Sequence, residues 1–193
     1  IGSGIYMELP SYSSASKNLY ANGGVVKGEV VLNNSSNYGG TIKITGSDEG
    51  ATVFEGTVRS NGGTIEKGTF TGEVINNGTI TGGEFSGEVT NNKTISGGTF
   101  TTVINGEGGT IAEGASITTL KFIVTFDNEG VTTTAIINNG DKLTAPTATK
   151  DGYTLDGWYY AKDDSTEAEW NFDTDTVTRT MTLKAKWTAN PPA

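Results

Sequence analysis

The chain of 193 residues is 34% hydrophobic and 18% charged, and its 28 glycines make it unusually rich in small uncharged residues. Because it has no histidine and no cysteine, it lacks the imidazole base and the thiolate of many hydrolases, the usual zinc ligands and every disulfide. Its formal charge of −9, with no basic patch, would repel a polyanion, so nucleic acid is not an expected partner.

Membrane and export signals are the next features to exclude. No apolar run approaches the roughly 18 residues that a membrane-spanning helix needs. No basic stretch followed by an apolar stretch opens the chain. We therefore expect no membrane span in this segment, and a soluble chain from which any export signal has already been removed.

The glycines are distributed unevenly along the chain. Before residue 121 there are 24 of them and after it only four, whereas all three tryptophans lie after residue 121. This change in composition predicts two domains with a boundary near Leu120.

A repeat of 15 residues fills the middle of the glycine-rich part. Residues 63–77 read GTIEKGTFTGEVINN, residues 78–92 read GTITGGEFSGEVTNN, and residues 93–107 read KTISGGTFTTVINGE. A further copy begins one residue late at Gly109, and a frayed form of the pattern continues upstream, which makes about six turns. The repeat predicts three apolar columns: Ile65, Ile80 and Ile95; Phe54, Phe70, Phe85 and Phe100; and Val58, Val74, Val89 and either Val103 or Ile104.

Each repeat has the pattern of very short strands. A large apolar residue is flanked by Thr, Ser or Glu, as in Thr79-Ile80-Thr81, and glycines or an Asn-Asn pair separate the strands. A helix is disfavoured because glycine and β-branched residues at this density oppose it. The expected fold of residues 23–120 is a short-rung parallel β-helix with rungs of about 15 residues, in which the pairs Asn76-Asn77 and Asn91-Asn92 stack as amide ladders. This half resembles the short-rung parallel β-helices of adhesins.

The two ends of the chain are less regular. Residues 1–22, with Tyr6, Leu9, Tyr12 and Tyr20 among serines, are interpreted either as a cap over the first rung or as a linker from an upstream domain. Residues 189–193 contain a Pro-Pro pair and are expected to begin an extended linker.

Residues 121–188 carry signatures of a known module. They include VTFDNEG at 124–130, Ala145-Pro146, GYTLDGWY at 152–159, WNFD at 170–173 and MTLKAKW at 181–187. In order and spacing these motifs resemble the Listeria-Bacteroides repeat, also called the internalin B-repeat type, of bacterial surface proteins. Two residues depart from the family pattern, Leu155 where Phe is usual and Lys184 where Tyr is common. The resemblance implies a compact β-grasp-like module without enzymatic activity in a protein exported to the cell surface, and it brings no catalytic residues.

Aromatic residues dominate this second half. We expect the large rings to form its small core, namely Tyr153, Trp158, Trp170, Phe172 and Trp187. Strand alternation predicts that Tyr159 faces water if Trp158 and Tyr160 face inward. An exposed tyrosine can stack on a sugar, so Tyr159 and Tyr160 are the candidate binding residues.

Acidic side chains are the remaining candidates for chemistry. Glu73 and Glu88 occupy equivalent positions one rung apart, with Glu29 in the same column, and such pairs can perform glycosidic acid–base catalysis or bind Ca²⁺. The favoured interpretation is structural, because a repeat copies surface residues together with core residues. The acidic cluster made by Asp163, Asp164, Glu167 and Glu169 lacks EF-hand spacing and is interpreted as a solvated loop. We predict no catalytic residue, no metal site and no cofactor.

The columns of threonine in the repeat suggest one further alternative. Thr64, Thr79, Thr94 and Thr110 resemble the flat threonine face of ice-binding β-helices, but Glu66 and Lys93 interrupt it.

The function predicted for the whole segment is non-catalytic. We interpret it as a structural and adhesive part of a secreted or surface-attached bacterial protein, in which a β-helical stalk and a repeat module present or space a binding region. The alternative is a carbohydrate-binding module for host or plant glycans, with a groove between stalk and module lined by Tyr159 or Tyr160. Host glycans, host proteins and the bacterial cell wall all stay open as partners.

Overall fold

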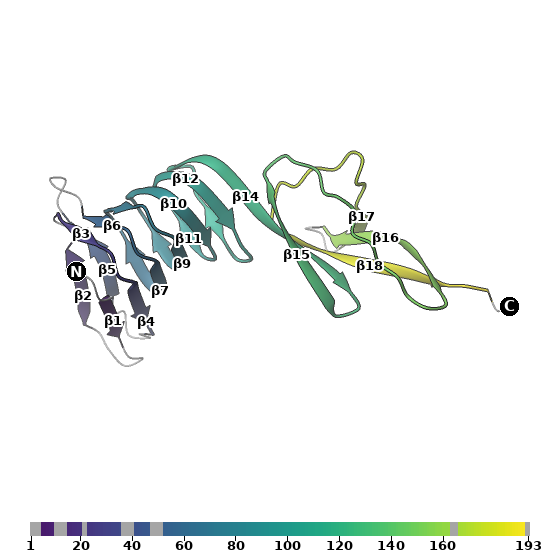
Figure 1. Cartoon of the computed structure of the whole chain (residues 1–193), viewed down its shortest axis with the longest axis horizontal. Coiled ribbons are helices and arrows are strands. Elements are labelled where there is room, and N and C mark those ends of the chain that lie inside the picture. The colour runs from purple at the N-terminus through teal and green to yellow at the C-terminus, as the bar shows by residue number, and fades with distance from the viewer. Residues whose placement is uncertain are drawn as a thin grey trace. The chain divides into compact units, whose positions relative to one another are not determined.

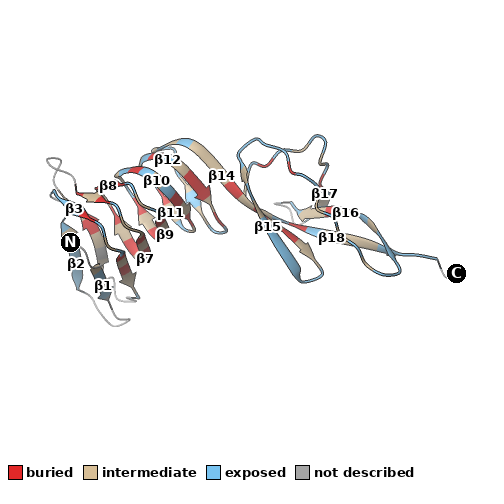
Figure 2. Cartoon of the chain, in the orientation of Figure 1, coloured by how far each residue is buried: buried red, intermediate tan, exposed pale blue. Residues whose placement is uncertain are grey.

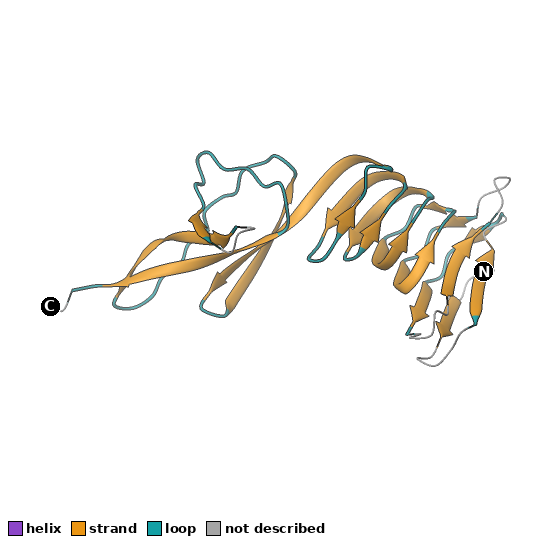
Figure 3. Cartoon of the chain, turned by 180° about the vertical axis from the view of Figure 1, so that it is seen from behind, coloured by secondary structure: helices purple, strands orange, loops and turns teal. Residues whose placement is uncertain are grey.

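The computed structural model describes residues 5–9, 15–20, 23–35, 41–46, 52–162 and 166–191. Within these ranges the chain forms strands and loops and no helix (Figure 3), so the expectation of a mainly β protein is confirmed. The chain divides into two compact units, Ile1–Leu120 and Lys121–Ala193.

Eighteen strands lie in the described residues, and their bounds follow in chain order. The first ten are β1 (Ile5–Leu9), β2 (Ser16–Tyr20), β3 (Val25–Val26), β4 (Val30–Asn34), β5 (Thr41–Thr45), β6 (Val53–Phe54), β7 (Val58–Ile65), β8 (Thr69–Phe70), β9 (Val74–Ile80) and β10 (Glu84–Asn91). The others are β11 (Thr94–Ile95), β12 (Gly98–Asn105), β13 (Thr110–Ile111), β14 (Ala115–Asn128), β15 (Val131–Asn138), β16 (Tyr153–Ala161), β17 (Glu167–Glu169) and β18 (Met181–Ala189).

The strands of the first unit pair in parallel with the strands of the next repeat, and we call the arrangement of β1–β13 the parallel stack (Figure 1). Ile65 pairs with Ile80, Ile80 with Ile95, and Ile95 with Ile111. The predicted isoleucine column is therefore confirmed. Val89 pairs with Val103, so Val103 and not Ile104 continues the valine column.

A column of four phenylalanines forms the centre of this unit's core. Phe54, Phe70, Phe85 and Phe100 are each at most 2% exposed. Consecutive rings stack with centroids 4.8, 4.6 and 4.5 Å apart and planes within 9° of parallel. The buried residues follow the interior of the stack from rung to rung (Figure 2), because strand neighbours about 4.8 Å apart bring identical side chains into contact.

Asparagine side chains form two ladders along the stack, as the sequence predicts. In the buried ladder, Asn76 Nδ2 donates to Asn91 Oδ1 at 2.8 Å, and Asn91 Nδ2 donates to Asn105 Oδ1 at 2.7 Å. In the more exposed ladder, Asn92 Nδ2 donates to Asn77 Oδ1 at 2.9 Å. Each buried amide therefore finds its partners in the neighbouring rungs, which avoids the cost of an unsatisfied polar group.

Glycines permit the close approach of successive rungs at their corners. A Cβ added at Gly87 would collide with the backbone carbonyl of Gly72 in the previous rung. Gly68 has a φ of +133°, which other residues rarely adopt.

The stack extends upstream into residues 5–9 and 16–20. β1 pairs with β4 and β2 pairs with β5, both in parallel. Tyr6 and Tyr20 are 62% and 65% exposed, so strand pairing rather than these rings joins the segment to the next rung. Tyr12 lies outside the described residues.

The second unit contains a mixed five-stranded sheet in the order β15-β14-β18-β16-β17. The central pair β14–β18 is parallel, and the other pairs are antiparallel. Val177 N donates to the Asp141 carbonyl at 2.9 Å and Gly140 N donates to the Val177 carbonyl at 2.8 Å, which joins the two long loops to each other. The buried side chains are Phe122, Val124, Phe126, Leu143, Trp158, Trp170, Val177 and Leu183.

The predicted aromatic core is only partly right. Trp158 and Trp170 are buried, but Phe172 and Trp187 are half-buried. The prediction that Tyr153 belongs to the core was wrong, because it is 40% exposed at the beginning of β16. The Lys150 ammonium lies 4.0 Å from its ring centroid. Leu143 and Val177 supply aliphatic volume from the loops instead.

Candidate functional site

β16 positions both tyrosines that the sequence analysis selected. Trp158, Tyr159 and Tyr160 are consecutive in this strand, so their side chains alternate between the two faces of the sheet. Trp158 is 4% exposed and meets Phe126 edge-on, with 5.2 Å between ring centroids. Tyr160 therefore lies on the core face, as Trp158 does, whereas Tyr159 lies on the opposite face. Both tyrosines are half-buried.

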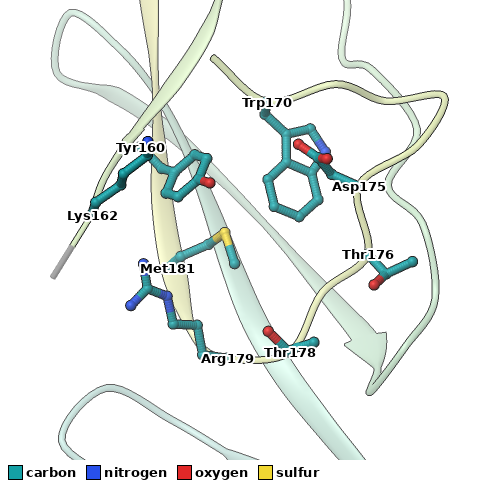
Figure 4. Close-up of a pocket in the computed structure, with 8 residues that line it drawn as sticks. All are labelled: Tyr160, Lys162, Trp170, Asp175, Thr176, Thr178, Arg179 and Met181. Atoms are coloured by element: carbon teal, nitrogen blue, oxygen red, sulfur yellow. The ribbon is translucent and has the colours of Figure 1, made fainter. Parts of the chain in front are cut away.

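A hollow of about 690 Å³ opens beside Tyr160, and we call it the Tyr160 hollow (Figure 4). The rings of Tyr160 and Trp170 meet edge-on, with 5.8 Å between centroids and 75° between planes. Trp170 is held in place because its backbone N–H donates to the Trp158 carbonyl at 2.7 Å. Met181 of β18 lies between Tyr160 and Arg179 in the same view, and it forms the apolar part of the lining together with the two rings.

Charged and polar side chains form the rest of the lining. Arg179 donates from Nη2 to the Ala161 carbonyl at 3.2 Å, and Lys162 and Asp175 also line the hollow. A concave surface with aromatic walls and a few polar groups is the usual form of a small-molecule site. This arrangement can hold a ligand that offers both an apolar face and hydroxyl groups.

Tyr159 has a different environment, on the opposite face of the sheet. The Lys186 ammonium lies 4.2 Å from the Tyr159 ring centroid and 2.6 Å from the Glu167 carboxylate. The hydrogen bond from Lys186 is the main cause that lowers the pKa of Glu167, and the same bond raises the pKa of Lys186. Lys186 therefore covers one face of the Tyr159 ring and keeps a ligand from stacking there.

A smaller hollow of about 320 Å³ includes both tyrosines in its lining. It shares Arg179 and Met181 with the Tyr160 hollow and adds Lys184 of β18. Tyr160 therefore takes part in both hollows, whereas Tyr159 takes part only in the smaller one.

Most residues that line the Tyr160 hollow were not selected from the sequence, and three of them matter for its chemistry. Asp175, Arg179 and Met181 belong to the last loop and to the first residue of β18. The sequence gives a signal for one of them: Arg179 is the one basic residue between Lys162 and Lys184 in an acidic chain. Which of them meets Tyr160 depends on how the loop before β18 packs, and no local pattern reports that.

The glutamates Glu73 and Glu88 of the first unit lie in one column in neighbouring rungs, as their spacing in the repeat predicts. Val58, Val74 and Val89 pair in register, which places Thr57, Glu73 and Glu88 in one column immediately before them. Glu29 belongs to that column, two rungs from Glu73. Its Oε1 forms an ion pair with Arg59 Nε at 2.7 Å.

The acidic cluster of the second unit is only partly described. Asp163 and Asp164 lie outside the described residues. Glu167 is paired with Lys186, as given above. Across the ranges that the structure describes, no group of three or more acidic, histidine or cysteine side chains is arranged to hold a metal ion.

The threonine column of the ice-binding alternative is in register. Thr64, Thr79, Thr94 and Thr110 pair successively along the stack. At the upstream end of the column, Glu66 Oε1 forms an ion pair with Lys43 Nζ at 2.7 Å, which places two charges beside the threonines.

A comparison with protein families matches residues 122–186 to the Listeria-Bacteroides repeat domain. Internalin H of Listeria monocytogenes is 38% identical to this chain over 74 residues, which are 37% of the chain and 13% of that protein. The similarity therefore concerns the second unit and about an eighth of the relative's length. Within the described ranges, no helix has the length and apolar character needed to cross a bilayer.

Proposed function

We propose that this chain is a non-catalytic structural segment of a bacterial surface protein, in which a stalk and a repeat module space or present a binding region. The observation that carries the proposal is the continuous column from Phe54 to Phe100, joined by parallel strands in register. Such a stack buries its core only by adding rungs, so it grows along one direction and suits a spacer.

The first unit is assigned in this proposal to the short-rung parallel β-helices. Parallel pairing at intervals of about one repeat, interior columns of identical residues and glycine corners support that assignment. The pairing of β1 and β2 with β4 and β5 favours including residues 5–20 as a first rung rather than as a linker. Residues 23–120 form the remainder of the stalk in this assignment.

Residues 121–188 are assigned to a β-grasp-like module, followed by a linker over 189–193. The mixed sheet with the parallel pair β14–β18 at its centre supports this assignment. The match to the Listeria-Bacteroides repeat supports a role as a non-enzymatic repeat module. The absence of histidine and cysteine from the sequence agrees with a segment that performs no catalysis.

Location at the cell surface is part of the proposal, and the similarity to Internalin H and to the repeat family supports it. Host proteins, host glycans or the cell wall are the proposed partners of the larger protein. An antibody raised against the purified chain should label intact bacteria that make the full-length protein, and external protease should remove the label. Labelling that requires permeabilised cells would contradict the surface assignment.

A carbohydrate-binding module is the second candidate function, and the Tyr160 hollow favours it. A sugar ring offers the apolar face and the hydroxyl groups that this hollow can accept. The hollow lies within the second unit, so this candidate does not depend on a groove between the two units.

A glycan array tests this second candidate. Saturable binding should weaken about tenfold or more in Tyr160→Ala, because that ring lines both hollows, and less in Tyr159→Ala. Tyr153→Ala is the matched control, since Tyr153 is an exposed tyrosine of the same strand outside the hollows. A silent array, or equal losses in all three variants, would reject a sugar site here and leave the spacer function in place.

A further inference from the structure

The outer strand β15 is firmly held on one side only. All eight residues from Val131 to Asn138 pair antiparallel with β14. The connecting turn at Glu129-Gly130 has φ values of 52° and 94°, as a tight two-residue hairpin requires, and Gly130 N donates to Asp127 Oδ1 at 2.7 Å. Among the residue pairings of the described strands, β15 pairs with β14 alone, and β16 pairs with β17 and β18.

The two edges of the sheet differ in their protection against pairing. β17, at the opposite edge, has three residues, of which Glu167 and Glu169 are charged. β15 has eight residues, VTTTAIIN, without charge, glycine or proline, and six of them are β-branched. Short length and charge are the common devices that prevent edge-to-edge association, and β15 has neither.

The side chains of β15 are open to solvent along most of the strand. Val131 is 72% exposed and Ile136 is 54% exposed, and the three threonines between them are exposed as well. In an antiparallel ladder about half of the backbone N–H and C=O groups of a strand point to each side. About four of each therefore point away from β14 and are available to another strand.

We propose that β15 pairs antiparallel with β15 of a second copy of this chain, so that two five-stranded sheets join across a two-fold axis. A two-fold interface needs one patch that complements itself, and an uncharged strand of β-branched residues does so. The net charge of −9 makes two copies of the chain repel each other, and an uncharged edge strand adds nothing to that repulsion. A strongly charged partner strand would gain no ion pair there.

Sedimentation analysis of the whole chain tests the proposal. One strand pair is a small interface, so we expect a reversible monomer–dimer equilibrium between about 10 µM and 1 mM. Thr134→Lys should weaken dimerisation about tenfold or more, because each subunit then places a lysine at the edge next to its partner. Ile136→Lys should have the same effect, and unchanged tryptophan fluorescence would verify the fold of both variants.

Thr182→Lys is the matched control. Thr134 pairs with Thr125, and Thr125 pairs with Thr182, so all three lie in one row on the same face of the sheet. The control adds the same charge in a central strand, and it should dimerise as the wild type does. Dimerisation that survives Thr134→Lys would overturn the proposal by placing the interface elsewhere. A wild-type chain that stays monomeric up to about 1 mM would overturn it too, and would leave the edge to a strand of another protein.

Discussion

The two units of this chain build their cores from aromatic rings in opposite ways. In the parallel stack, rings of one residue type face one another nearly parallel, with planes 7° to 9° apart. In the second unit, different residue types meet edge-on, as for Phe126 with Trp158 at 79° and Tyr160 with Trp170 at 75°.

The cause of this difference lies in the strand pairing. Parallel strands in register place equivalent residues side by side, so their side chains adopt the same rotamer and the rings must stack face to face. The second unit has no internal sequence repeat, and its rings belong to strands and loops that are unrelated in sequence. Repetition makes the stack's packing readable from the sequence, whereas the packing of the second unit depends on long-range folding.

The largest expected effect comes from removing one ring of the stack. Phe85→Ala should lower the free energy of unfolding of the first unit by about 3–5 kcal/mol, because it leaves a cavity between two stacked neighbours. Far-UV circular dichroism during denaturant unfolding should show the loss. All three tryptophans lie in the second unit, so the transition followed by tryptophan fluorescence should stay in place.

Phe172→Ala is the control for this experiment. Phe172 is half-buried in the second unit and has a smaller cavity to leave. Phe172→Ala should shift the unfolding transition followed by tryptophan fluorescence and leave the transition of the first unit, followed by circular dichroism, unchanged. A Phe85→Ala variant that unfolds like the wild type would show that the phenylalanine column does not carry the core of the stack.

A smaller effect is expected from the buried asparagine ladder. Asn91 is fully buried and bridges Asn76 and Asn105, so Asn91→Ala removes the partner of one donor, Asn76 Nδ2, and of two acceptors, Asn105 Oδ1 and the Thr110 carbonyl. We expect a loss of about 1–3 kcal/mol in the dichroism transition. Asn92→Ala removes a rung of the more exposed ladder, where water can replace the amide, and it should cost less than about 1 kcal/mol. Equal losses would contradict the ladder's dependence on burial.

The smallest effect concerns pH. The hydrogen bond from Lys43 is the main cause that holds the pKa of Glu66 below its ordinary value of 4.5. A folded-state pKa below the unfolded value adds stability above the unfolded value, and this contribution disappears as the pH falls through the folded pKa. Between pH 7 and pH 3 the wild type should therefore lose more stability than Glu66→Gln, by less than about 1 kcal/mol because the pair is partly exposed. If urea unfolding gave the same change in the free energy of unfolding with pH for the wild type and Glu66→Gln, the predicted contribution of Glu66 would be refuted.

Much of the first unit could be predicted from the sequence. The period of 15 residues located Ile65, Ile80 and Ile95 in one column and the asparagine pairs in ladders, and both are present. This was possible because each rung meets only its neighbours, so spatial contact follows directly from sequence spacing.

The candidate site could be predicted only in part. Alternation along β16 placed Tyr159 and Tyr160 on opposite faces. It did not reveal that Lys186 covers Tyr159, that Trp170 and Met181 join Tyr160 around a hollow, or that Tyr153 is exposed. These neighbours come from segments whose approach is decided by the whole sheet.

The sequence by itself determined the repeat, the residues that stack within it and the signatures of the second unit, since each depends on contacts at a constant spacing along the chain. Only the tertiary structure decided that β14 and β18 lie parallel at the centre of the second sheet and that the uncharged β15 lies at its edge. Strand order is a global property, because it arises when segments more than 50 residues apart compete for the same backbone hydrogen bonds.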